Sequence, residues 1–301
     1  MPDNTAPIVV GVNGSFVADH AALWAAAVGS RLDAPLHILT ATPYLGHNPS
    51  DATAAIRAAA IAEHREVAEQ MLKAAEEAVR REHPALVVTT TSVDEPADEA
   101  LSAASRTARL LVLGCDDVTA TGAMLVGSTT LATLAHAVCP VVAWRGDSVA
   151  PTDQPIVVGV EGSAGDRGAL GTAFELADSL GAPLRAVHSW SRSRPEADVT
   201  IPFLVNWDEW EDEQWQHLNE QVVPWRDRYP GVKVTLICGP VKPSRALLHQ
   251  GTDAQLVVVG SRRRNALTRG LFGSTSLNLL HHSTVPVVLC AFSQDESSSS
   301  S

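Results

Sequence analysis

Short apolar runs alternate with longer amphipathic stretches along the whole chain. In the first half we predict strands at Ile8–Val12, Leu36–Thr40, Leu86–Thr91, Leu110–Gly114 and Val141–Trp144. In the second half we predict them at Ile156–Val160, Leu184–His188, Lys233–Cys238, Leu256–Gly260 and Val287–Cys290. Most of these runs are apolar at nearly every position, which is typical of strands buried on both faces of a parallel sheet.

The stretches between the strands have helical patterns. They predict helices over Ala18–Leu32, Asp51–Glu82, Asp98–Arg106, Arg167–Leu180, Asp208–Tyr229 and Ser244–Thr252. This alternation predicts an α/β protein with two tandem, doubly wound, parallel five-stranded sheets, each a Rossmann-like or flavodoxin-like α/β sandwich. Ligands of such sheets bind at the carboxyl ends of the strands, where the strand order reverses. The loops after the first and fourth strands are therefore the candidate site.

The two halves repeat one unit. "PIVVGVNG" at residues 7–14 returns as "PIVVGVEG" 148 positions later, and "VGSTTLATLAHAVCPVV" from Val126 returns as "FGSTSLNLLHHSTVPVV" after 146 positions. A fixed offset of this size indicates duplication of a whole domain. We expect domains at residues 1–146 and 155–293, followed by a polar tail, residues 294–301, that is too polar to fold.

Composition narrows the function classes. The formal net charge of −12 makes nucleic acid an improbable partner, because phosphate backbones favour basic surfaces. No apolar run reaches the roughly 18 residues that a membrane span needs, and the N-terminus does not resemble a secretory signal. The four cysteines are widely spaced and form no metal-ligand pattern, so we expect buried, reduced thiols in a cytoplasmic protein.

The loop after the fourth strand has the same skeleton in both units. A glycine ends the strand, and about a dozen residues later Gly-Ser-Thr opens a helix. These residues are Gly114, Gly127, Ser128 and Thr129 in the first unit, and Gly260, Gly273, Ser274 and Thr275 in the second. Ser and Thr at this place can simply cap the helix. The same N–H groups, with the helix dipole and a small glycine, can instead bind a phosphate.

The charges of the two loops differ. The second-unit loop contains four arginines, Arg262, Arg263, Arg264 and Arg269, and arginine binds phosphate bidentately. The first-unit loop carries Asp116 and Asp117 instead, which weakens polyanion binding. The arginines can also form a solvated loop or a contact with an acidic surface, so both interpretations stay open.

The chain resembles the universal stress protein family over nearly its whole length, through "IVVGVNGS", "IVVGVEGS", "LRAVHSW" and the two strand-four loops. ATP-binding members of that family have Gly, two residues, Gly, nine residues, then Gly followed by Ser or Thr. Both units keep the spacing and the last element, but Asp117 and Arg263 replace the middle glycine. Arg263 could block the phosphates or pair with them.

The loop after the first strand departs from the family as well. Asn13 and Glu161 stand where ATP-binding members have aspartate, beside Ser15 and Ser163. The resemblance implies that Thr40–Ala41 and His188–Ser189 border an adenine, although His188 is also interpreted as a buried strand-end histidine with a structural role.

Three functions remain open. The first is an ATP-binding regulatory stress protein, with Mg²⁺ accompanying the nucleotide, a degenerate site in the first unit and an altered one in the second. The second is a nucleotide-free scaffold for an unidentified protein partner, and the third is a slow ATP hydrolase. GxxxxGK[ST], GxSxG and HExxH patterns are absent, and we name no catalytic residue. The resemblance and the apolar last strands suggest pairing of like domains, within the chain or in a homo-oligomer.

Overall fold

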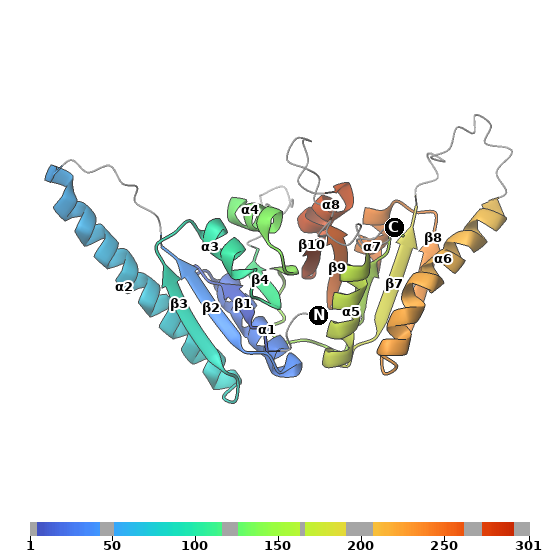
Figure 1. Ribbon diagram of the computed structural model, residues 1–301, viewed down its shortest axis with the longest axis horizontal. Helices are drawn as coiled ribbons and strands as arrows, with labels where there is room; N and C mark the ends of the chain where they lie inside the picture. The colour runs from blue at the N-terminus through green and yellow to red at the C-terminus, as the bar shows by residue number, and fades with distance from the viewer. Residues whose placement is uncertain are drawn as a thin grey trace, which may run out of the picture. The chain divides into compact units, whose positions relative to one another are not determined.

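The computed structural model describes residues 5–42, 51–115, 126–162, 166–190, 207–261 and 273–291. The chain divides into two compact units, Met1–Pro151 and Thr152–Ser301. Each described unit holds a parallel sheet with helices on both faces (Figure 1). The prediction of two tandem α/β units is confirmed.

The first unit has five strands and four helices. The strands are β1 (Ile8–Gly11), β2 (Leu36–Ala41), β3 (Val88–Val93), β4 (Leu110–Gly114) and β5 (Val141–Trp144). The helices are α1 (Phe16–Leu32), α2 (Asp51–Glu82), α3 (Ala97–Ala104) and α4 (Ser128–His136). The predicted bounds of α2 are those observed.

The second unit repeats this pattern within its described residues. Its strands are β6 (Ile156–Gly159), β7 (Leu184–Ser189), β8 (Val234–Gly239), β9 (Leu256–Ser261) and β10 (Val287–Ala291). Its helices are α5 (Asp166–Leu180), α6 (Trp207–Arg228), α7 (Pro243–Gln250) and α8 (Ser274–His282). The bounds of α7 and α8 lie 146 positions after those of α3 and α4, so the duplication extends to whole helices.

The strand order within each sheet is that of a Rossmann unit. It runs β3-β2-β1-β4-β5 in the first unit and β8-β7-β6-β9-β10 in the second. Right-handed crossovers therefore place α1 and α2 on one face and α3 and α4 on the other, and each pair packs together. The order reverses beside β1 and beside β6, which puts the switch points next to the predicted loops.

The core explains why these runs are strands. β1, β4, β6 and β9 pair with neighbours on both sides, and Ile8, Val112, Ile156 and Val258 are all fully buried. The edge strand β3 differs from its prediction by two residues. The Leu86 N–H donates to the His83 carbonyl at 3.1 Å in the turn after α2, so pairing starts later, at Val88.

Candidate functional site

The predicted site residues within the described ranges lie at the carboxyl ends of the strands or at the helix starts that follow them. Asn13 and Ser15 follow β1, Ala41 ends β2, and Gly114 ends β4. In the second unit, Glu161 follows β6, His188 lies in β7 and Gly260 in β9. Ser163 and Arg263 lie outside the described residues, as do the other loop arginines and Asp116 and Asp117. The charge contrast between the two loops therefore stays a prediction from sequence.

The loop after β1 is held by its own side chains. The Ser15 N–H donates to Oδ1 of Asn13 at 3.1 Å, and Oγ of Ser15 accepts from the Ala18 N–H at 3.2 Å. Ser15 is thereby the N-cap of α1, and Gly14 makes the turn with φ of 77°. Asn13 thus has a local structural role that needs no negative charge.

The loop after β6 is held differently. Oδ2 of Asp166 accepts from the N–H groups of Glu161 and Gly162, at 2.9 and 2.6 Å. Asp166 is only 3% exposed and begins α5, at the position that small, buried Ala18 occupies in the first unit. The second unit therefore directs two loop N–H groups at a carboxyl group of its own. Sequence reasoning missed Asp166, whose signal was an acid immediately before the predicted helix Arg167–Leu180.

Each of these loops is in contact with a helix, α2 in the first unit and α6 in the second. A Cβ added at Gly14 would lie 2.6 Å from Sδ of Met71 in α2, and one added at Gly162 would collide with Nε2 of His217 in α6. Gly162 also has φ of 82°. Backbone conformation therefore favours glycine at both positions, and a side chain at either would also have to displace Met71 or His217.

The ends of β2 and β7 are tied to the preceding strand. Oγ1 of Thr40 donates to the Val12 carbonyl at 2.9 Å, and Nδ1 of His188 lies 2.7 Å from the Val160 carbonyl. Because a carbonyl oxygen only accepts, Nδ1 of His188 carries the proton. The unprotonated Nε2 lies 3.0 Å from Oε1 of Gln214, and the Gln214 amide donates to it in the orientation with its oxygen and nitrogen exchanged. His188 is 7% exposed. Both ring nitrogens are engaged within the fold, in keeping with the structural interpretation of His188.

Two tryptophans extend the packing around His188. The Trp190 ring lies 5.7 Å from the imidazole and meets the Trp210 ring edge-on at 4.7 Å. Trp210 and Gln214 both come from the start of α6. Sequence reasoning missed Gln214, because only the docking of α6 on the sheet brings it to β7.

The strand-four loop begins at a close approach in the first unit. A Cβ on Gly114 would lie 3.0 Å from the Ala18 nitrogen and from the Val17 backbone. The end of β4 thus contacts the first turn of α1, and only glycine fits without a shift. The structure brings Gly114 together with the helix that Ser15 caps.

The helices α4 and α8 begin without a side-chain cap. Their N-cap residues are Gly127 and Gly273, and neither position has a side-chain cap hydrogen bond. Both glycines are exposed, and an added Cβ would meet nothing within 4 Å. Ser128, Thr129, Ser274 and Thr275 lie inside the first turns, not at the N-cap. The simple capping interpretation of Gly-Ser-Thr is therefore wrong, because the capping position is a glycine.

These helix starts fit the phosphate end of a nucleotide. Uncapped first-turn N–H groups and the positive end of the dipole face an open glycine. In the second unit the groups that could contact a nucleoside already have partners, because Asp166 accepts from the Glu161 N–H and His188 bonds the Val160 carbonyl. No group of three or more His, Cys, Asp or Glu residues that could hold a metal ion occurs among the residues described.

Taken with the switch-point loops, the fold defines a tandem pair of doubly wound α/β domains in which glycines are the N-caps of α4 and α8. The universal stress protein family matches residues 5–145 and 154–291. The chain belongs to the universal stress protein family.

Relatives match along nearly their whole length. A universal stress protein of Mycolicibacterium smegmatis is 33% identical over 286 residues, covering 94% of this chain and 96% of the relative. One of Mycobacterium tuberculosis is 32% identical over 300 residues, with the same coverage. A solved universal stress protein structure from Archaeoglobus fulgidus aligns with a TM-score of 0.66 at 18% identity, covering 97% of this chain and 99% of that one. None of the described helices is long and apolar enough to cross a membrane.

Proposed function

We propose that this protein is a regulatory member of its family that binds an adenine nucleotide, ATP with Mg²⁺, with its phosphates at the start of α8. Binding would change which protein partners or like domains the chain contacts, without turnover. The sequence lacks the GxxxxGK[ST] pattern, whose lysine and hydroxyl serve phosphate and Mg²⁺ in one class of ATP hydrolase.

The observation that carries this proposal is the exposed, uncapped start of α8. Gly273 supplies no side-chain acceptor to the first-turn N–H groups, and a Cβ added there would meet no described atom within 4 Å. Four orphan N–H groups at a helix start form a ready site for an anion. The helices α1 and α4 offer useful contrasts, because Ser15 caps the first whereas Gly127 leaves the second open.

Sequence charge favours the second unit over the first. The segment that precedes α8 contains four arginines and no carboxylate, whereas the segment that precedes α4 contains Asp116 and Asp117. Guanidinium groups add to the helix dipole in attracting a triphosphate, and carboxylates oppose it. We therefore assign the nucleotide to the start of α8.

A matched pair of substitutions tests this assignment. Gly273→Asp places a carboxylate at the N-cap of α8, where it accepts from the first-turn N–H groups and repels phosphate. Gly127→Asp makes the same change at α4. Because neither site crowds a Cβ, both variants should be at least as stable as the wild-type protein. ATP binding, measured by isothermal titration calorimetry, should be lost only in Gly273→Asp.

Each other outcome has a defined meaning. Loss of binding only in Gly127→Asp would move the site to the first unit, and binding unaffected by both variants would remove the helix starts from the proposal. Phosphate release above the blank, abolished by Gly273→Asp, would show hydrolysis.

The second candidate is a nucleotide-free scaffold, and the loop after β6 favours it. Asp166 occupies two of its N–H groups, and His188 is bridged to Gln214. The scaffold predicts no adenine nucleotide released on heat denaturation of the purified protein. It also predicts no thermal stabilisation by millimolar ATP.

A further inference from the structure

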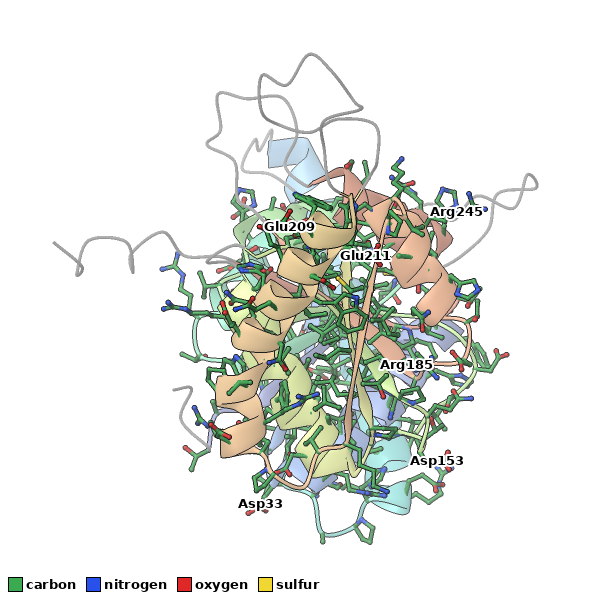
Figure 2. All side chains as sticks on the ribbon, turned by 90° about the vertical axis from the view of Figure 1, so that its right-hand side faces the viewer. Asp33, Asp153, Arg185, Glu209, Glu211 and Arg245 are labelled. Atoms are coloured by element: carbon green, nitrogen blue, oxygen red, sulfur yellow. The ribbon has the colours of Figure 1, made fainter. Side chains whose placement is uncertain are left out.

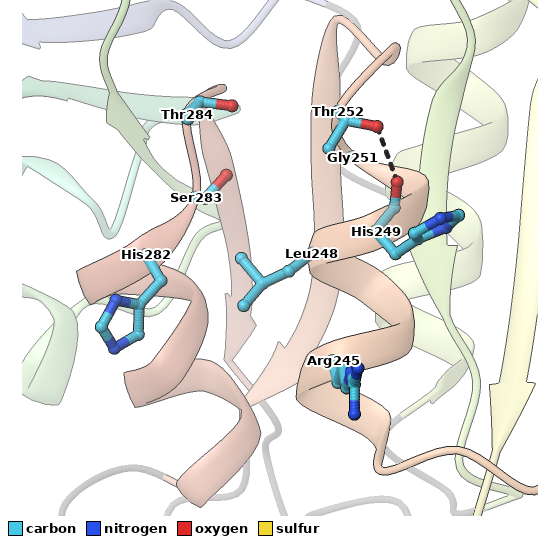
Figure 3. A pocket seen from close by; sticks show the side chains of 8 residues that line it. All are labelled: Arg245, Leu248, His249, Gly251, Thr252, His282, Ser283 and Thr284. Atoms are coloured by element: carbon cyan, nitrogen blue, oxygen red, sulfur yellow. Dashed lines mark hydrogen bonds between the residues drawn. The ribbon is translucent and has the colours of Figure 1, made fainter.

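A cavity of about 320 Å³ lies in the second unit between the ends of α7 and α8. Its lining includes Leu248 of α7 and His282 of α8, together with residues that follow each helix (Figure 3). These helices run antiparallel to the strands, so their last residues lie near the amino ends of β9 and β10. The cavity is therefore at the opposite edge of the sheet from Gly273.

The lining of the cavity combines one apolar side chain, Leu248, with polar groups. Leu248 points into the space between the two helices, and His282 lies on the α8 side of it (Figure 3). Arg245 comes from the first turn of α7, and Thr284 follows α8. Small-molecule sites commonly combine such an apolar surface with a few polar groups that orient the ligand.

Three polar side chains of the lining can form further hydrogen bonds. Within the described part of the chain, the side chains of Arg245, His282 and Thr284 make no hydrogen bond or ion pair. By contrast, Ser283 Oγ donates to the Val285 carbonyl at 2.7 Å, and Thr252 Oγ1 donates to the His249 carbonyl at 2.8 Å. A ligand would therefore meet a guanidinium, an imidazole and a hydroxyl that can all donate.

Arg185 compensates two of the negative groups near the cavity. Arg185 binds Asp253 through two hydrogen bonds of 2.6 and 2.9 Å, and its Nη1 also donates to the Gln250 carbonyl at 3.3 Å. These bonds to Arg185 are the largest cause that lowers the pKa of Asp253. Arg185 thus offsets the Asp253 carboxylate and one C-terminal carbonyl of α7, whereas the other C-terminal carbonyls of α7 and α8 still oppose an anion, so Arg245 must outweigh them.

The acidic side chains of α6 do not contribute to this rim. The helices α5 and α6 cover one face of the sheet and α7 and α8 the other. In Figure 2, the labelled Glu209 and Glu211 lie on α6, whereas Arg185 and Arg245 lie toward α7. Among the lining residues, the charged side chain is therefore that of Arg245, which is positive although the chain as a whole is acidic.

The first unit does not repeat this chemistry. At the positions 146 earlier, Glu99 replaces Arg245 and Ala103 replaces His249, whereas His136 matches His282. The cationic rim is thus a property of the second unit and not of the duplicated fold.

We propose that this cavity binds a small organic anion, with its carboxylate or phosphate head group on Arg245 and its apolar body over Leu248, on the side of the pocket that His282 borders. The guanidinium offers a planar, bidentate match to either head group. The proposal is independent of nucleotide binding at α8.

The probes are benzoate and phenyl phosphate, with benzamide as the neutral analogue. Binding to the full-length protein is followed by the imidazole carbon–proton NMR signals of His282, assigned by His282→Gln. Benzoate or phenyl phosphate should shift the His282 signal saturably and benzamide should not. The relative affinities of the two anions identify the preferred head group.

Arg245→Gln should weaken binding of the better anion by roughly tenfold or more, because a charge-assisted hydrogen bond is lost. Arg106→Gln is the matched control, since it removes an exposed arginine near the corresponding edge of the first unit. Gly273→Asp should leave anion binding unchanged even where it abolishes ATP binding. The proposal is overturned if benzamide binds as well as the anions, if none of the three probes shifts His282, or if Arg245→Gln and Arg106→Gln bind alike.

Discussion

Nδ1 of His188 lies 2.7 Å from the carbonyl oxygen of Val160, and the same connection exists in the first unit between Thr40 and Val12 at 2.9 Å. Each bond joins the end of the second strand of a unit to the residue after its first strand. The carbonyls of Val12 and Val160 lie beyond the paired part of their strands, so a side chain and not a backbone N–H donates to each of them. Two chemically different residues thus do the same work in the two copies.

Substitution at His188 should separate this bond from the packing of the ring. His188→Val leaves the Val160 carbonyl without its partner, and an unsatisfied buried acceptor costs about 1–3 kcal/mol. His188→Thr introduces the residue of the first unit and can restore the bond. We expect the His188→Thr variant to have a free energy of unfolding about 1–3 kcal/mol higher than that of His188→Val, as measured by chemical denaturation.

The comparison of Thr with Val is well controlled because the two side chains have nearly the same shape. Equal stability of the two variants would mean that the bond to Val160 contributes nothing, and that His188 acts through Gln214 and Trp190 alone.

Gly162 should not tolerate a side chain. A non-glycine residue in the left-handed region costs about 1–2 kcal/mol, and Ala at this position also collides with His217. We expect Gly162→Ala to lower the free energy of unfolding by at least that amount. Adding His217→Ala should recover only the part that comes from the collision.

Measurement of both single variants and the double variant completes this cycle. Full recovery in the double variant would show that the backbone relaxes freely, and full stability of Gly162→Ala alone would contradict both causes.

Cys238 should react slowly with alkylating agents although it is only half-buried. Burial and, secondarily, the charge of Glu211 raise the pKa of its thiol to about 11. At pH 8 about one thiol in a thousand is then ionised, and the thiolate is the reactive form. Glu211→Gln removes a repelling charge, so the pKa falls and alkylation of Cys238 at a given pH should accelerate.

Site-resolved mass spectrometry of iodoacetamide-treated protein measures this rate. Glu213→Gln, on the same helix, serves as the control and should leave it unchanged. Burial raises the pKa of Cys290 to about 12, so that thiol should stay unmodified in both variants. A slower reaction of Cys238 in Glu211→Gln would contradict the assigned cause.

Much of the fold follows from local pattern. Runs such as "IVVG" and "LLVLG" are apolar at every position because their strands are covered on both faces, and this predicts a parallel sheet with helices on both sides. The repeat offsets predict two like units, and the glycines at 127 and 273 mark the starts of α4 and α8. Strand ends were less predictable, as β3 shows, because an apolar residue such as Val87 can also lie exposed just before a strand, at 65%.

The sequence by itself determined the architecture of this protein and the places where its loops meet, because burial and backbone conformation leave a local periodic signal. Only the tertiary structure decided what those loops hold. Asp166 takes the N–H groups after β6, Gln214 reaches His188 from α6, and α7 and α8 border an open pocket that Arg245 helps to line. The last two join residues far apart in the chain and depend on the angle and depth at which helices dock on the sheet, whereas the Asp166 bonds span only four and five residues. No periodicity in the sequence encodes that geometry.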